Sequence, residues 1–212
     1  MNIALIGASG FIGTALRREA LARGHALTAL VTQPRKLEAG PGLTITRADV
    51  NSTDELASLL AGHDAVLSAF SGHAQEDVEG YYLKGMRSIL EATRRSGVRR
   101  LLVAGGAGSL EVAPGVQLLD TPQFPAAYRA SAEGARKALA LLRAEGGVDW
   151  TMLSPSAVIA PGDRTGRFRL GDDQLLANAQ GESRISVEDY AVAFIDELEK
   201  PTHSRRRFTV GY

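Results

Sequence analysis

The stretch "LIGASGFIGTALRREALARGHALTALVT" (residues 5–32) decides the fold. Three glycines, Gly7, Gly10 and Gly13, stand three residues apart, directly after the apolar run "NIALI" (residues 2–6). Apolar side chains then recur at helical spacing, and a further apolar run follows. This order predicts a strand, a tight glycine turn, an amphipathic helix and a second strand.

The same alternation of short apolar runs with helical patterns continues along the chain. Expected strands lie at residues 2–6, 26–32, 43–50, 64–70, 99–106, 149–155 and 206–212, and expected helices at 11–23, 52–62, 76–97, 128–145 and 187–200. Strands that are almost continuously apolar are typical of a parallel sheet covered by helices on both faces. We therefore predict an α/β fold with a Rossmann-type, doubly wound parallel sheet.

Cap signatures and turn-rich stretches refine this prediction. Ser52 with Glu55 forms a predicted capping box, and Ser186 precedes the last helix with Asp189 at its third position. The turn residues gather in 109–127 and 160–184. Because ligands bind at the carboxyl ends of strands in such folds, we assign these loops to a small substrate-side lobe of one domain, residues 1–212.

Composition excludes several classes of function. The 212 residues include 24 basic and 24 acidic side chains, which argues against nucleic-acid binding. The absence of cysteine rules out disulfides, thiolate catalysis and cysteine-ligated zinc, and the four scattered histidines predict no metal site. We find no signal peptide and no stretch apolar enough to span a membrane. We therefore expect a cytoplasmic protein.

The glycine turn has the chemistry of a dinucleotide site. Helix N-terminal N–H groups and the helix dipole favour a pyrophosphate, and glycine lets it approach the backbone. The spacing G-x-x-G-x-x-G differs from the strict G-x-G-x-x-G fingerprint, so a tight turn without a ligand is the alternative. The expected cofactor contacts in this turn are Gly7, Ser9, Gly10, Phe11, Ile12 and Gly13.

Several longer motifs resemble a known family. "IGASGFIGTALRREALARGH" resembles the opening of extended and atypical short-chain dehydrogenase/reductases. "LLVAGGAGSLEVAPG", "DTPQFPAAY", "LSPSAVIAPGDRTG" and "ESRISVEDYAVAFIDELE" are similar to the NADH-flavin reductase group, within the NAD(P)H-binding, NmrA-like set. The resemblance covers almost the whole chain. It implies a Rossmann-type fold that binds NAD(P).

The end of the second strand bears on which dinucleotide is bound. Thr32 stands where NAD-binding proteins usually carry an acidic residue, and Arg35 and Lys36 follow. Without a carboxylate to repel it, a 2′-phosphate finds two cations here. This favours NADP(H) over NAD(H). The alternative is that Arg35 and Lys36 are solvated loop charges.

The resemblance also implies contacts after the third and fourth strands. An Asp at the position of Asp49 bonds the adenine amino group, with Val50 lining the ring, although Asp49 is equally suited to cap the following turn. Ala69, Phe70 and Gly72 are expected beside the adenosine ribose. Gly105 and Pro155, after the fifth and sixth strands, are expected beside the nicotinamide.

The acid/base pair of typical short-chain dehydrogenases is absent. Their Tyr-x-x-x-Lys motif uses the lysine to lower the pKa of the tyrosine. Here the fourth residue after Tyr128 is Ala132, and no other tyrosine has lysine at this spacing. Ser109 and Tyr128 remain candidate catalytic residues. The alternatives are that Ser109 stabilises its own turn and that Tyr128 packs at a helix start.

Two functions follow from these residues. The first is an NAD(P)H-dependent oxidoreductase that transfers hydride to a flavin, as substrate, or to a similar planar acceptor, since such chemistry needs little from the protein beyond positioning. The second is a non-catalytic NADP(H) sensor of the NmrA-like type. We expect a dinucleotide and a small planar acceptor as partners, and a monomer or a homodimer formed through the helix at 76–97.

Overall fold

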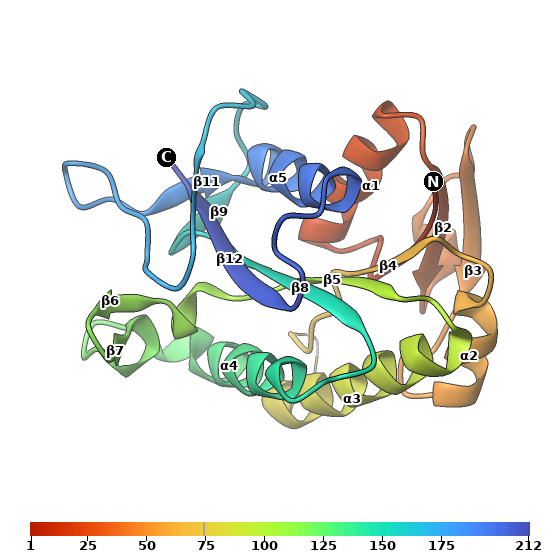
Figure 1. Cartoon of the computed structure of the whole chain (residues 1–212), viewed down its shortest axis with the longest axis horizontal. Helices are drawn as coiled ribbons and strands as arrows, with labels where there is room; N and C mark the ends of the chain where they lie inside the picture. Colours follow the sequence, from red (N-terminus) through yellow and green to blue (C-terminus); the bar gives the residue numbers. More distant parts are fainter. Residues whose placement is uncertain (74) are drawn as a thin grey trace.

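The computed structural model describes residues 1–73 and 75–212. Its centre is an eight-stranded sheet in the order β10-β12-β8-β5-β4-β1-β2-β3, drawn in Figure 1. The strands are β1 (Asn2–Ile6), β2 (Ala26–Val31), β3 (Leu43–Arg47), β4 (Ala65–Ser68), β5 (Arg100–Ala104), β8 (Asp149–Ser154), β10 (Arg169–Gly171) and β12 (Arg206–Gly211). All neighbours pair in parallel except β10, which is antiparallel to β12.

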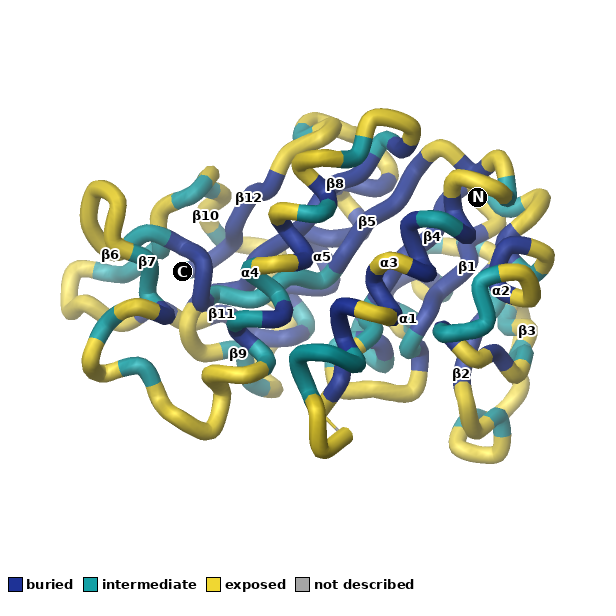
Figure 2. The backbone as a smooth tube through the Cα atoms, turned by 90° about the horizontal axis from the view of Figure 1, so that it is seen from below, coloured by how far each residue is buried: buried dark blue, intermediate teal, exposed yellow. Residues whose placement is uncertain are grey.

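Helices cover both faces of this sheet. They are α1 (Phe11–Ala22), α2 (Thr53–Leu60), α3 (Val78–Ser96), α4 (Arg129–Arg143) and α5 (Val187–Glu199). Helices α1 and α5 lie on one face, and α2, α3 and α4 lie on the other (Figure 1). Each face has its own apolar core. The central strands are buried while most connecting loops are exposed (Figure 2), which confirms the predicted Rossmann-type sheet.

Two helix starts test the predicted caps. The Ser186 hydroxyl accepts a hydrogen bond from the Asp189 N–H at 3.0 Å, so this cap is confirmed. The capping box at Ser52 is wrong, because the Ser52 side chain makes no cap bond. The turn before α2 is closed instead by Asp49, whose backbone oxygen accepts the Ser52 N–H at 3.0 Å. Because the chain turns at Asp49, the third strand ends at Arg47, three residues earlier than expected.

The expected substrate-side lobe contains short strands as well as loops. Residues 109–127 hold the hairpin β6 (Glu111–Ala113) and β7 (Val116–Gln117). Residues 158–186 hold the parallel pair β9 (Val158–Ala160) and β11 (Arg184–Ser186). Strands of two or three residues carry no periodicity that a sequence could reveal. Two backbone bonds of 2.8 Å, from the Glu111 N–H to the Asp173 oxygen and from the Leu175 N–H to the Glu111 oxygen, join the two stretches.

The loop at residues 161–168 is tied to α1. Arg164 donates two hydrogen bonds to the carboxylate of Glu19, at 2.7 and 2.8 Å. These bonds, together with those from Arg23, hold the pKa of Glu19 below its ordinary value although burial raises it. The buried Glu19 therefore stays ionised and connects the lobe to the helix that begins at the glycine turn.

Asp189 is a second anchor of the same loop. Its carboxylate is fully buried. It accepts hydrogen bonds from the Thr165 hydroxyl at 2.6 Å, the Gly166 N–H at 2.8 Å and the Tyr212 hydroxyl at 2.8 Å. A buried carboxylate with three donors is well compensated. Removing it leaves the Gly166 N–H without its acceptor, while the Thr165 and Tyr212 hydroxyls keep only the Arg167 oxygen at 3.4 Å and the Ser186 hydroxyl at 2.9 Å.

Two absences among the described residues bear on function. Among them, no helix combines the length and the apolar character needed to cross a membrane. Within the same residues, no three or more His, Asp or Glu side chains gather in a way that suits a metal ion.

We predict that Asp189→Ala lowers the free energy of unfolding by about 3 kcal/mol, because the Gly166 N–H loses its acceptor and two hydroxyls lose their hydrogen bonds to a buried carboxylate. Urea unfolding followed by circular dichroism measures this loss. Asp54→Ala is the matched control, since the Asp54 side chain is 87% exposed in its ion pair with Arg95 and contributes little. Equal losses in the two variants would contradict the role given to Asp189.

Candidate functional site

The glycine turn lies at the carboxyl end of the central strand β1, between β2 and β4. Gly7 has a φ of +79°, in the left-handed region that favours glycine. Its N–H donates to the Leu30 oxygen at 3.1 Å. A Cβ at this position would lie 2.7 Å from the Ala69 oxygen. Gly7 is therefore required by the packing of the chain itself.

The other two glycines differ in what requires them. A Cβ on Gly13 would overlap the carbonyl oxygen of Gly7, so Gly13 lets α1 lie directly on the turn. A Cβ on Gly10 would meet only the Gly7 oxygen, at an ordinary 3.4 Å, and Gly10 has a φ of −78° that any residue adopts. The protein's own packing thus leaves Gly10 unexplained. Free access for a ligand to the backbone explains it.

The start of α1 offers that ligand unpaired donors. Gly10 is the N-cap residue and provides no side chain to cap the first turn, which also carries no acidic residue. Ser9, Gly10 and Phe11 are exposed, and Ile12 is partly exposed. An uncapped, exposed helix N-terminus suits an anion such as a pyrophosphate. The residues of the turn therefore fit the predicted dinucleotide.

The end of β2 bears the predicted 2′-phosphate residues. Thr32 directly follows the strand, and Arg35 and Lys36 lie in a short 3₁₀ turn at residues 34–36. All three residues are exposed. Neither cation forms an ion pair with another described residue, so both remain open to an anionic group.

The residues after β3 make contacts within the fold. The Asp49 carboxylate accepts the Asn51 N–H at 2.9 Å, which supports the alternative that Asp49 caps its own turn. Asp49 is nevertheless exposed, so its carboxylate faces solvent as well. The Val50 side chain is buried in the core beneath α2 and α3.

The segment after β4 follows the edge of the sheet beside the turn. The Ala69 N–H donates to the Ile6 oxygen at 2.9 Å. The Phe70 ring stacks on Tyr82 of α3, with ring centroids 5.8 Å apart, and it occupies the space left by the missing side chain of Gly85. Gly72 is buried against the start of α3. The Phe70 ring is therefore directed into the core, and the backbone of Phe70 is the part that can face a ligand.

Hydrogen bonds join the ends of β5 and β8. The Leu153 oxygen accepts both the Gly105 N–H at 2.8 Å and the Tyr190 hydroxyl at 2.7 Å. Burial raises the pKa of Tyr190 far above its ordinary value, so this hydroxyl remains a donor. Gly105 and the buried Pro155 therefore lie on a rigid part of the carboxyl edge.

The two candidate catalytic residues lie in different environments. Ser109 is buried, and its hydroxyl accepts a hydrogen bond from Arg207 at 3.1 Å. This contact supports a structural role for Ser109. Tyr128 is 61% exposed at the start of α4, so its side chain is free to contact a ligand.

The residue four positions after Tyr128 is Ala132, and it lies where α4 contacts the turn after β5. The turn after β5 lies directly on α4, because a Cβ on Gly108 would be 2.8 Å from the Ala132 Cβ and one on Gly106 would be 3.1 Å from the Ala135 Cβ. Ala132 and Ala135 therefore pack closely against this turn. Lys137, further along α4, is paired with Glu79 at 2.5 Å.

Two groups at this edge were not identified from the sequence. Ser154, the last residue of β8, is fully buried, and its hydroxyl has no hydrogen-bond partner among the described residues. Tyr82 is also buried, and burial raises its pKa. The pair Ser-Pro at the end of the predicted strand 149–155 is a signal for Ser154. No signal in the sequence marks Tyr82, since its position depends on the packing of α3 against α4.

We predict that Gly10→Ser weakens NADPH binding at least about tenfold while unfolding stability changes by less than about 1 kcal/mol, since Ser suits an N-cap but its hydroxyl occupies the first-turn donors. Gly13→Ala should instead destabilise the whole protein, because its Cβ overlaps the Gly7 oxygen. NADPH fluorescence titration and thermal unfolding separate the two effects. Unchanged affinity in a folded Gly10→Ser variant would contradict the assignment.

Comparisons with known proteins agree with this geometry. A family model described as NAD(P)H-binding matches residues 7–198. The Bacillus subtilis protein YwnB, which is uncharacterized, is 39% identical over 99% of this chain and 98% of its own. A "putative epimerase" from Bacteroides thetaiotaomicron is 44% identical, with a TM-score of 0.93 over 100% of this chain and 96% of its own. A "putative NADH-flavin reductase" from Streptococcus pneumoniae is 34% identical, with a TM-score of 0.89 over 100% and 99%.

The family match covers nearly the whole chain and includes every glycine of the turn. Its start at Gly7 coincides with the residue whose left-handed backbone begins the turn. The chain belongs to the NAD(P)H-binding family.

Proposed function

We propose that this protein is an NAD(P)H-dependent reductase that transfers hydride to a flavin or a similar planar acceptor. The observation that carries the proposal is the combination of an open dinucleotide turn with the absence of a lysine four residues after Tyr128. Gly10 and the uncapped start of α1 suit a pyrophosphate, whereas Ala132 packs against Gly108 where a Tyr-x-x-x-Lys enzyme needs its lysine. The similarity to the Streptococcus pneumoniae protein supports the same reaction class.

The proposed reaction needs little acid/base catalysis from the side chains of the protein. A bound NAD(P)H supplies the hydride, the acceptor takes both electrons, and solvent supplies the accompanying proton. The chain contributes positioning, through the first-turn N–H groups of α1 and the rigid edge formed by Gly105 and Leu153. The exposed Tyr128, beside the lobe, is proposed to contact the acceptor.

We propose NADP(H) as the preferred dinucleotide. Arg35 and Lys36 are exposed and without ion-pair partners among the described residues, and Thr32 brings no negative charge to the end of β2. A 2′-phosphate placed there gains attraction to two cations and meets no carboxylate at Thr32.

Replacing both cations, in Arg35→Ala/Lys36→Ala, should weaken NADPH binding at least about tenfold and change NADH binding less than about twofold, since NADH has no 2′-phosphate. Calorimetric titration with each dinucleotide measures the ratio. Lys84→Ala removes an exposed charge on α3 and serves as the control. An equal loss of affinity for both dinucleotides would show that Arg35 and Lys36 act only as general surface charge.

The reaction itself is tested by following NADPH at 340 nm with FMN as acceptor. We expect oxidation by the wild-type protein above the rate without protein, and a large reduction of that rate in Gly10→Ser at subsaturating NADPH. Binding of NADPH with no oxidation by flavins or quinones would refute the reductase. That result would favour the non-catalytic NADP(H) sensor, which the absence of the Tyr-x-x-x-Lys motif also supports.

A further inference from the structure

Arg47 is the last residue of β3, an edge strand of the sheet (Figure 1). Its partner in the parallel register is Val31, the last residue of β2, and the Ala48 N–H donates to the Val31 oxygen at 3.0 Å. The connection that carries Arg35 and Lys36 begins directly after Val31. Arg47 therefore lies at the carboxyl edge of the sheet, next to the start of this connection.

The alternation of side chains along β3 places Arg47 on the face of the sheet that α1 covers. Leu43 and Ile45 pack against the apolar core on the α1 face, whereas Ala48 belongs to the core on the opposite face. Because successive side chains of a strand point to opposite faces, Arg47 shares the face of Leu43 and Ile45. Leu37, from the β2–β3 connection, packs against the same core, and the short 3₁₀ turn before it contacts β3.

Arg17 of α1 faces the same connection from the other side. Residues four apart lie on one face of a helix, and Leu21, four residues after Arg17, lies against the connection. The Cδ2 atom of Leu21 is 3.4 Å from the position that a Cβ on Gly42 would take. Gly13, four residues before Arg17, lies on the glycine turn. Arg17 is therefore between the turn and the connection, and its buried Nε has no hydrogen-bond partner in the described part of the chain.

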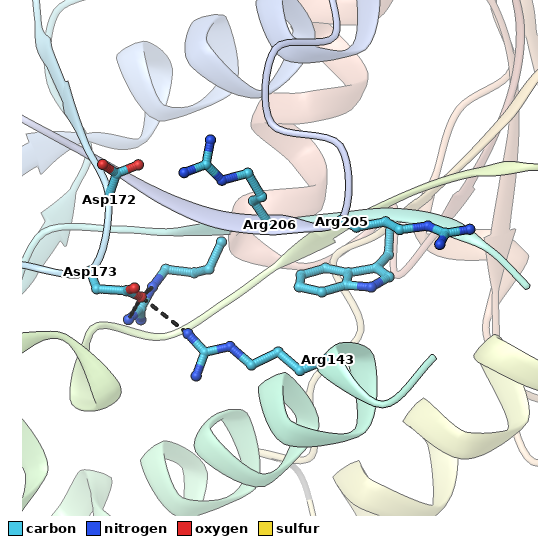
Figure 3. A pocket seen from close by; sticks show the side chains of 7 residues that line it. Arg143, Asp172, Asp173, Arg205 and Arg206 are labelled. Atoms are coloured by element: carbon cyan, nitrogen blue, oxygen red, sulfur yellow. Dashed lines mark hydrogen bonds and ion pairs between the residues drawn. The ribbon is translucent and has the colours of Figure 1, made fainter. Parts of the chain in front are cut away.

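Other arginines of the protein are paired with carboxylates. Arg143 and Arg207 both donate to Asp173, at 3.2 and 2.6 Å (Figure 3). The side chains of Arg17 and Arg47 form no ion pair or hydrogen bond with any residue that the structure describes, and Arg47 is exposed. Two arginines without counter-charges thus flank the β2–β3 connection, one from α1 and one from β3.

The acidic residues of this region do not neutralise its cations. Glu38 is the only acidic residue of the connection, and Asp49 follows β3. Against these two carboxylates stand four cations, so that two positive charges are in excess: Arg17, Arg35, Lys36 and Arg47. A phosphate monoester, with a charge of about −1.5 to −2 at neutral pH, is the kind of group that such an excess suits.

We propose that Arg17 and Arg47 bind the 2′-phosphate of NADP(H) together with Arg35 and Lys36. This inference rests on the proposed dinucleotide site and assigns its specificity to residues from α1, β3 and the β2–β3 connection. Guanidinium groups donate charge-assisted hydrogen bonds to phosphate oxygens, often two at a time. NAD(H) carries a hydroxyl in place of this phosphate, so it gains far less from the same cations.

The test is a calorimetric titration with NADPH and with NADH, which gives the ratio of the two dissociation constants. Arg47→Gln and Arg17→Gln each remove a charge and keep a polar side chain. We expect each to lower NADPH affinity at least about fivefold and to change NADH affinity less than about twofold. Arg47→Lys and Arg17→Lys keep the charge and should retain part of the preference. Arg99→Gln, an exposed arginine directly before β5 at the amino edge, is the matched control and should keep the wild-type ratio.

The outcomes separate this inference from the proposed function. If the wild type binds neither dinucleotide, both fail. If the wild type prefers NADPH and the two glutamine variants keep its ratio, only the inference fails. A lower ratio in one variant alone overturns the role of the other residue. Equal losses of affinity for NADPH and NADH would show that these arginines act as general surface charge, and would also overturn the inference. Urea unfolding checks that each variant is folded, and the lysine variants supply the comparison if a glutamine variant is not.

Discussion

The contact between the Gly7 carbonyl and the first turn of α1 is the constraint on which the site depends. No Cβ fits at Gly13, and none fits at Gly7 against Ala69, so strand β1, helix α1 and the end of β4 meet backbone to backbone. This contact aims the uncapped N–H groups of α1 at the carboxyl edge of the sheet. The donors that this turn offers are backbone N–H groups, so they do not titrate and do not depend on a side-chain conformation.

Glycines also allow close packing at the other half of the carboxyl edge. Gly105 lies against Met152 and Leu153, and Gly108 lies against Ala132. The shared acceptor Leu153 joins β5, β8 and α5 through Gly105 and Tyr190. Close packing of this kind joins β5, β8, α4 and α5 at this part of the carboxyl edge.

The sequence could predict features that depend on local patterns. Strand–turn–helix order, the glycine positions and the Ser186 cap follow from neighbours a few residues apart, and the structure agrees with them. Ser52 shows the limit, since Asp49 closes the turn that its side chain was expected to cap. Contacts between distant residues were out of reach: nothing near Ser109 indicates Arg207, and nothing near Asp189 indicates Tyr212. The edge strand β10, with three residues, is too short for a periodic signal.

The missing dyad also restricts which acceptors suit the proposed reaction. Reduction of a carbonyl places negative charge on one oxygen, and a positioned proton donor must neutralise it as the hydride arrives. A flavin spreads that charge over its ring system, so the proton can follow from water. Tyr128 is exposed and has no lysine four residues further on, and burial raises the pKa values of Tyr82 and Tyr190. For the proposed reaction we therefore favour a planar acceptor with delocalised charge over a carbonyl.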